Sequence, residues 1–260
     1  MISSTDFDRL KKLIVIVVTL LALNSNLVLA SKNNHKQLVG WDQAIPQNIQ
    51  RQTNQYPDVF HIRGTKKGKN IALSFDDGPS EHTTELLKIL KQYKVKATFF
   101  WLGKAIENHP EIVKQAYQQG HLIANHSFSH AKLNQLSAEQ LWKNEILPTQ
   151  NLLKSLINYQ PKLFRAPFGE ITDQQIEYLA KHQMKVIGWS LDSNDWRYSQ
   201  DENGHKNIIS IIQDHYESNS IIVMHDGGGD RHQTLLAVKK LIPEMQAKGY
   251  SLVTIDEILQ

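Results

Sequence analysis

The sequence of 260 residues contains no cysteine, which excludes disulfide bridges and thiolate chemistry. An exported protein is compatible with this absence. Excess charge of one sign is also lacking, because the formal net charge is only +3 and the basic residues are dispersed. We therefore expect no nucleic-acid partner. The apolar and charged fractions are those of an ordinary globular protein, and the length allows one large core.

Long apolar runs are missing as well. The run near the N-terminus, Leu13–Leu23, follows Arg9, Lys11 and Lys12 and is shorter than the roughly 20 residues that span a membrane. Val28–Ala30 then resembles a signal-peptidase site. We expect residues 1–30 to be a cleaved signal peptide, with an uncleaved membrane anchor as the alternative. Either one predicts a protein exported to the periplasm, the cell envelope or the extracellular space.

Residues 31–68 are rich in Asn, Gln and Lys and show little apolar periodicity. Such a composition buries too little apolar surface to offset the entropy of ordering, so it predicts a polar tether. From residue 69 to residue 260, short apolar runs alternate with amphipathic stretches, which indicates parallel βα units of one catalytic domain. About seven such units can close into a barrel. The expected strands are 70–75, 97–102, 121–125, 162–164, 186–191, 221–224 and 252–255, and the expected helices are 81–93, 105–119, 138–157, 173–182, 207–216 and 233–248.

Polar residues follow five of these strands directly. In α/β barrels the active site lies at the carboxyl ends of the strands, so we expect these side chains to meet at one face. They are Asp76 and Asp77, His126, Arg165, Asp192 and Asp195, and His225.

The adjacent carboxylates of Asp76 and Asp77 disfavour joint ionisation, and a bound metal ion relieves this conflict. His126 and His130, four residues apart, supply further ligands of the kind that zinc prefers. One aspartate and two histidines form the three-ligand pattern of a catalytic zinc site that keeps a position open for water. The pattern predicts a metal-dependent hydrolase. Neither a serine-nucleophile signature nor a glycine-rich phosphate loop is present, which disfavours acyl-enzyme chemistry and nucleotide binding.

Five ordered segments together resemble the motifs of the polysaccharide deacetylase family, also called the NodB-homology or carbohydrate esterase 4 group. The resemblance covers about residues 69–260. It implies a distorted (β/α)7-type barrel, a divalent metal ion and the removal of acetyl groups from acetylated sugars. The segments are Ser74–Pro79, His126–His130, Arg165–Gly169, Asp192–Trp196 and Val223–His225.

The same resemblance implies roles for single residues. Asp77, His126 and His130 hold one divalent ion, for which we expect Zn²⁺, with Co²⁺, Ni²⁺ and Mn²⁺ as alternatives. Asp76 is the base that takes a proton from the attacking water, and Arg165 orients it.

On the other side of the reaction, His225 resembles the general acid that protonates the leaving amine. Asp195 holds the imidazole of His225 and raises its pKa. The main-chain N–H of Phe168 helps to stabilise the oxyanion. Trp196 walls the acetyl pocket, and core packing is an equal alternative for it.

Other polar residues receive no catalytic role. Asp192 closes the junction between strand and loop, while His121, His205 and Asp230 are assigned no function. The glycine run Gly227–Gly229 is expected to be a flexible active-site loop.

The expected function is removal of N-acetyl groups from N-acetylglucosamine units of peptidoglycan or a chitin-like polymer. Two alternatives remain: an esterase for O-acetyl groups of xylan, and a metal-containing sugar-binding protein without turnover. The expected partner is the acetylated polysaccharide. No protein partner is inferred, and membrane contact is expected only through an uncleaved N-terminal segment.

Overall fold

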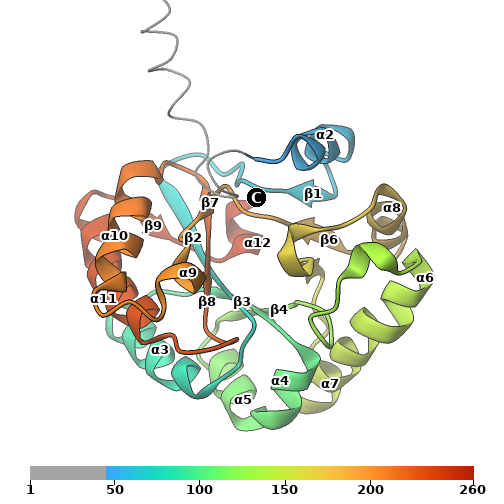
Figure 1. Ribbon diagram of the computed structural model, residues 1–260, viewed down its shortest axis with the longest axis horizontal. Coiled ribbons are helices and arrows are strands. Elements are labelled where there is room, and N and C mark those ends of the chain that lie inside the picture. Colours follow the sequence, from blue (N-terminus) through green and yellow to red (C-terminus); the bar gives the residue numbers. More distant parts are fainter. Residues whose placement is uncertain (1–44) are drawn as a thin grey trace, which may run out of the picture. The chain divides into compact units, whose positions relative to one another are not determined.

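The structure is a computed structural model that describes residues 45–260. The predicted signal segment and residues 31–44 lie outside the described residues. A single parallel sheet curls through the domain and helices surround it (Figure 1). The strand order is β1-β6-β5-β4-β3-β2-β8-β7, and β9 pairs with the beginning of β2. The expected distorted (β/α) barrel is confirmed.

The strands are short except for β2 and β8, which pair over six residues and are followed only by the edge strand β7. The strands are β1 (Phe60–His61), β2 (Asn70–Asp76), β3 (Thr98–Trp101), β4 (Leu122–Asn125), β5 (Leu163–Phe164), β6 (Lys185–Ile187), β7 (Leu191–Asp192), β8 (Ser220–His225) and β9 (Ser251–Leu252).

The helices cover the outer face of the sheet with their apolar sides. In α3, for example, Leu86, Leu87 and Leu90 are buried against the main core, and Ser80 caps the first turn. The helices are α2 (Gln47–Gln55), α3 (Glu81–Gln92), α4 (Gly103–Asn108), α5 (Pro110–Gln118), α6 (Ala138–Leu141), α7 (Leu147–Ile157), α8 (Asp173–Lys181), α9 (Asp195–Tyr198), α10 (Gly204–His215), α11 (His232–Ala247) and α12 (Ile255–Ile258).

Two predicted elements are divided in the structure. The expected helix 105–119 is two helices, because Pro110 lacks an N–H and begins a new helix at its first position. The expected strand 186–191 is interrupted after β6, where the Ile187 and Gly188 carbonyls accept hydrogen bonds from Arg165 instead of a neighbouring strand. The expected last strand is also shorter, because residue 255 already begins α12.

The prediction of a polar tether is wrong for residues 45–68. Helix α2 buries Ile49 against the domain, and β1 adds Phe60 to the edge of β6. Arg51 forms two hydrogen bonds of 2.8 Å with Asp173 at the start of α8. The average composition of the segment concealed these few apolar and charged anchors, which are enough to dock it.

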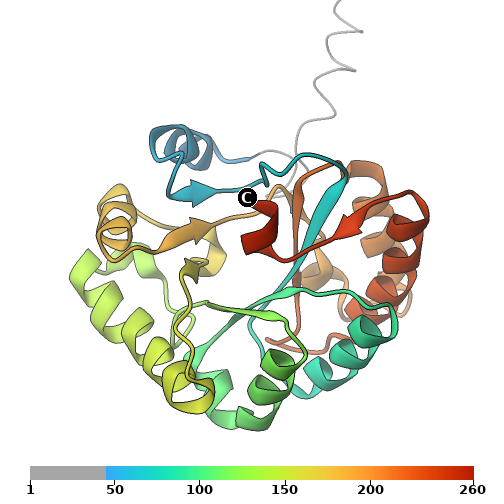
Figure 2. The same cartoon turned by 180° about the vertical axis from the view of Figure 1, so that it is seen from behind.

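The C-terminal helix α12 lies over the middle of the curled sheet when the domain is seen from behind (Figure 2). Ile255 and Ile258 pack there with Ala72, and the Ile255 N–H donates to Thr98 Oγ1 at the first residue of β3. Helix α12 thus covers the amino-terminal ends of the strands and leaves the carboxyl ends for the functional site. Within residues 45–260, no helix has both the length and the apolar character needed to cross a membrane.

Candidate active site

A cavity of about 600 Å³ opens at the carboxyl ends of the strands. Seven of the nine predicted site residues line it, and the other two, Arg165 and Asp195, are buried directly behind it. The parallel register explains the convergence, since β2 ends beside both β3 and β8. The lining residues among those predicted are Asp76, Asp77, His126, His130, Phe168, Trp196 and His225.

Asp77, His126 and His130 form the single group of three potential metal ligands found within residues 45–260. Asp77 Oδ1 lies 3.4 Å from His126 Nε2 and 3.2 Å from His130 Nε2. The His126 Nδ1 lies 2.8 Å from the Arg165 carbonyl, which fixes the ring with Nε2 toward Asp77. The Asp77 Oδ1 atom is buried and has no hydrogen-bond partner in the described domain. A buried carboxylate oxygen without a donor, facing two imidazoles, fits a metal ion.

The charge on Asp77 depends on these neighbours. Burial by itself raises the pKa of its carboxyl, but His126 and His130 hold that pKa well below the usual range. Asp77 is therefore ionised, as a metal ligand must be.

The backbone of this group is unusual. Asp77, Ser127 and His130 have φ angles of 71°, 77° and 61°, in the left-handed region that non-glycine residues rarely adopt. Such conformations persist when the surrounding structure holds them, and they cluster at functional sites.

Glu145 holds the loop between the two histidines. Its Oε2 accepts the N–H groups of Phe128 and Ser129, each at 2.9 Å, and its Oε1 accepts the Ser129 hydroxyl at 2.8 Å. Glu145 lies in a π-helical turn, Trp142–Ile146, that joins α6 to α7. Such turns occur frequently at functional sites. From the sequence we expected an ordinary helix here and missed the supporting carboxylate.

Asp76 and Arg165 form a buried ion pair. Asp76 Oδ1 lies 2.7 Å from Arg165 Nη1, which also donates to Ser74 Oγ. The guanidinium is fully buried and lies 4.0 Å from the ring centroid of Phe100. Because the Ile187 and Gly188 carbonyls occupy its remaining nitrogens, Arg165 cannot swing away. Asp76 thus has a fixed orientation while its side chain still reaches the cavity.

His225 and Asp195 form a second pair on the opposite side of the cavity. His225 Nδ1 lies 2.7 Å from Asp195 Oδ1, and Asp195 Oδ2 accepts the His225 N–H and the Thr234 hydroxyl. Burial by itself lowers the pKa of His225, but Asp195 outweighs that effect and the pKa rises to about 9. The imidazole therefore carries a proton at neutral pH.

Phe168 and Trp196 are aromatic residues at the rim of the cavity. They are 51% and 49% exposed, which excludes core packing for Trp196. The Phe168 ring meets His130 edge-on with centroids 4.6 Å apart, and its backbone φ is 59°. Both rings are accessible to a molecule that enters the cavity.

The structure also places the residues for which no catalytic role was expected. Asp192 lines the cavity, accepts the Asn194 N–H at 2.8 Å, and has a pKa raised by burial to about 6. His121 is buried, accepts the Ala97 N–H, and burial lowers its pKa to about 4. His205 bonds to Gln233, outside the cavity.

Asp226 and Arg231 are buried residues at the site that sequence reasoning missed. Asp226 accepts hydrogen bonds from Thr83 Oγ1 at 2.6 Å and Trp101 Nε1 at 3.0 Å, and burial raises its pKa to about 7. A Cβ on Gly78 would collide with the Asp226 carboxyl, which explains the glycine after the paired aspartates. Their position in the sequence was the available signal, since Asp226 lies between His225 and the glycine run and Arg231 follows two residues after Gly229.

A model of the polysaccharide deacetylase family matches residues 63–187. The chain is 35% identical over 204 residues to a peptidoglycan-N-acetylglucosamine deacetylase of Bacillus cereus, covering 78% of this chain and 72% of that protein. It is also 32% identical to a chitooligosaccharide deacetylase of Azorhizobium caulinodans, covering 73% and 94% of the two chains. The chain therefore belongs to the polysaccharide deacetylase family and is a deacetylase, a hydrolase of this class.

Solved structures agree with this assignment. The crystal structure of the Bc1960 peptidoglycan N-acetylglucosamine deacetylase has a TM-score of 0.75 at 33% identity, over 80% of this chain and 96% of that one. A carbohydrate esterase 4 domain of a multidomain xylanase, from a Trinervitermes trinervoides hindgut metagenome, has a TM-score of 0.66 at 30% identity. It covers 74% of this chain and 90% of that chain. The family resemblance expected from the five motifs is confirmed.

Proposed function

We propose that this protein removes N-acetyl groups from N-acetylglucosamine units of an envelope or extracellular polysaccharide, with peptidoglycan first and chitin-like polymers second. One observation carries the proposal: a metal-ligand group and two ion pairs suited to proton transfer converge on one cavity with exposed aromatic walls. The names of the relatives support the choice of substrate.

Asp77, His126 and His130 would hold one divalent ion, Zn²⁺ in the first place and Co²⁺, Ni²⁺ or Mn²⁺ as alternatives. One carboxylate and two imidazoles are a donor set that zinc accepts in catalytic sites. When bound, the ion would act as a Lewis acid that lowers the pKa of a water molecule and polarises the substrate carbonyl.

Asp76 accepts the proton that water loses as its oxygen attacks the acetyl carbon. Arg165 orients the Asp76 carboxylate through their 2.7 Å contact. The N–H of Phe168 donates to the carbonyl oxygen as negative charge develops there. His225, protonated on the other side, donates its proton to the nitrogen as the carbon–nitrogen bond breaks. Acetate and a free amine result.

Asp195 acts through His225. By accepting from Nδ1 it leaves Nε2 as the proton donor toward the cavity, and it compensates for the burial of the imidazolium. Trp196 and Phe168 form the walls against which the sugar and its acetyl group lie.

An O-acetyl esterase acting on xylan is the second candidate, favoured by the similarity to the xylanase domain. The same residues would hydrolyse either bond. A sugar-binding protein without turnover is less well supported, because a binder has no need for both Asp76 and His225 in place. Export remains our proposal for localisation, resting on residues 1–30 of the sequence.

The test is acetate release by the purified protein from peptidoglycan, chitooligosaccharides and acetylxylan, measured with zinc and after chelation. We expect release from peptidoglycan or chitooligosaccharides that stops on chelation and returns with zinc. Release from acetylxylan alone would establish the esterase instead. Zinc binding without release from any of the three would contradict the deacetylase proposal and favour a binding protein.

A further inference from the structure

A buried arginine that forms no direct ion pair within residues 45–260 lines the active-site cavity, although it attracts the buried carboxylate of Asp195 from a distance. Arg231 immediately precedes α11, is 4% exposed, and borders the cavity together with Asp77 and His225. Its Nε donates to the Gly227 carbonyl at 2.6 Å. No aspartate or glutamate of residues 45–260 forms an ion pair with its guanidinium.

The terminal nitrogens of Arg231 form no hydrogen bond within residues 45–260. Neither Nη atom is among the fully buried polar atoms that lack a partner in the described domain, so both keep access to the cavity. A Cβ on Gly228 would lie 3.4 Å from Arg231 Nη2 and 2.9 Å from Asp77 Oδ2. The missing side chain at Gly228 therefore leaves the space between the guanidinium and the metal-ligand aspartate open.

A buried cation whose terminal donors have no direct partner is costly, and an anion bound to those donors would offset the cost. The planar guanidinium presents two parallel N–H donors that match both oxygens of a carboxylate. Arg231 uses Nε for the backbone, so its Nη atoms are the ones left for a ligand.

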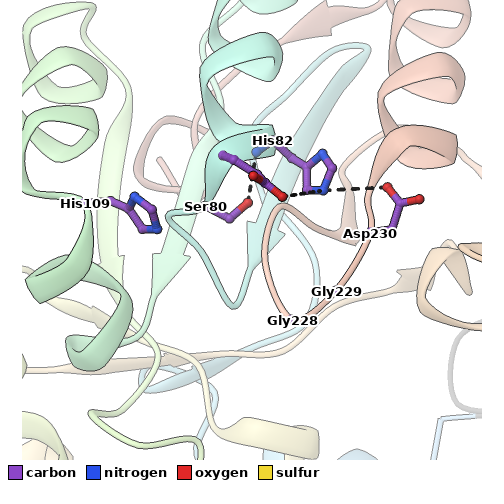
Figure 3. A pocket seen from close by; sticks show the side chains of 7 residues that line it. Ser80, His82, His109, Gly228, Gly229 and Asp230 are labelled. Carbon is purple, nitrogen blue, oxygen red and sulfur yellow. Dashed lines mark hydrogen bonds and ion pairs between the residues drawn. The ribbon is translucent and has the colours of Figure 1, made fainter.

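Gly228 and Gly229 line two hollows, and only the active-site cavity contains an arginine. Behind Gly228 and Gly229 lies a second hollow of about 600 Å³, lined by Ser80, Glu81, His82, His109 and Asp230 (Figure 3). There the Asp230 carboxylate points toward His82, with 3.6 Å between Oδ1 and Nε2. The second hollow contains no arginine or lysine, whereas the active-site cavity contains Arg231 beside the carboxylates of Asp76, Asp77 and Asp192.

Deacetylation itself supplies an anion to the cavity, because each turnover converts a neutral acetamide into acetate. We propose that Arg231 is a carboxylate-binding residue of the active-site cavity. The proposal rests on the proposed deacetylation. Two sources of the carboxylate share this chemistry: the acetate product, and an acidic group carried by the polymer close to the reacting sugar.

The first experiment measures acetate affinity directly, by titration of the zinc-loaded protein with ¹³C-labelled acetate, for wild type, Arg231→Gln and Arg231→Lys. We expect Arg231→Gln to weaken acetate binding by at least about tenfold, as for the loss of a hydrogen bond to a charged group. Arg231→Lys should lie between the two, because it keeps the charge and loses the planar fork. If Arg231→Gln does not fold, Arg231→Lys decides. Arg197→Gln is the matched control, since Arg197 is an exposed arginine near Trp196 that does not line the cavity, and it should bind acetate as wild type does.

The second experiment distinguishes the sources by comparing kcat/KM for a neutral chitooligosaccharide and for a peptidoglycan fragment with free carboxylates. A loss confined to the acidic fragment in Arg231→Gln, with acetate affinity unchanged, would support the polymer as the source. Equal acetate affinity in all variants, with equal effects on both substrates, would overturn the proposal, because a merely structural role predicts that outcome. Failure of the wild type to release acetate would refute the proposed function instead, and the acetate titration would still decide the role of Arg231.

Discussion

The two kinds of functional group in the cavity differ in how complete they are without a ligand. The metal set, Asp77, His126 and His130, leaves a buried carboxylate oxygen with no hydrogen-bond partner in the described domain. The two pairs to which we assign proton transfer, Asp76–Arg165 and Asp195–His225, each have a contact of 2.7 Å within the protein. The first set needs an external ion and the second does not. We therefore expect the occupancy of the metal set to depend on metal concentration, and the protonation of the two pairs to depend on pH.

The largest effect should come from breaking the metal set. Asp77→Ala removes the carboxylate that both histidines face, so we expect loss of bound zinc and turnover no higher than that of the chelated wild type. Metal analysis and acetate release on the same sample provide the measurement. Asp214→Ala, at an exposed position of α10, is the control and should keep both. Full turnover in metal-free Asp77→Ala would refute the metal assignment.

Breaking a proton-transfer pair should change the pH dependence and leave zinc in place. The His225 pKa of about 9 means that the proton donor is present below that pH and is lost as pH rises through it. In Asp195→Asn the largest influence that raises the His225 pKa is lost, and only the weaker attraction of Asp77 and Asp76 opposes burial, so the alkaline limb of the kcat profile should move down by about 1–3 pH units. At neutral pH, kcat should fall by up to about 10²-fold. An unchanged alkaline limb would show that His225 is not the group whose titration produces this limb of the kcat profile.

A smaller effect is expected when zinc binding is weakened without substituting a metal ligand. Glu145→Gln keeps the size of the side chain but replaces one acceptor oxygen by a donor, so the loop between His126 and His130 loses support. We expect zinc to bind about 10–100-fold more weakly, as for other residues that orient ligands. At saturating zinc, the alkaline limb should not move.

The matched control for that variant is Glu139→Gln. Glu139 lies on the neighbouring α6, is exposed and pairs with Lys143 at 2.7 Å. It should bind zinc as wild type does. Equal zinc affinity in the Glu145 and Glu139 variants would exclude a positioning role for Glu145.

The smallest effect on catalysis should come from the docked N-terminal segment. Ile49→Ala removes a buried side chain of α2 and should lower the free energy of unfolding by about 2–5 kcal/mol. Zinc affinity and the pH profile at 25 °C should be unchanged. Chemical denaturation measures the stability, and a wild-type value would indicate that the segment is not part of the cooperative domain.

Local sequence signals predicted the elements that position the site. Asp76, His126 and His225 each follow a run of apolar residues, so the strand ends and their polar neighbours were legible without coordinates. Two other contacts could not be predicted from sequence periodicity, because they depend on tertiary structure. Glu145 accepts hydrogen bonds from a loop 16 residues away, and Arg231 donates to Gly227 beside the cavity. The tether was misjudged for a related reason, because two buried residues, Ile49 and Phe60, dock a segment whose average composition is polar.

The central claim is that adjacent aspartates divide the work, with Asp77 in the metal set and Asp76 in a proton-transfer pair. The most direct test is zinc content and acetate release measured together on Asp76→Asn. This account predicts one zinc ion per chain and a turnover about 10²–10⁴-fold below wild type, because the base is lost and the ligands remain. Loss of zinc together with turnover, or wild-type turnover with zinc bound, would contradict it.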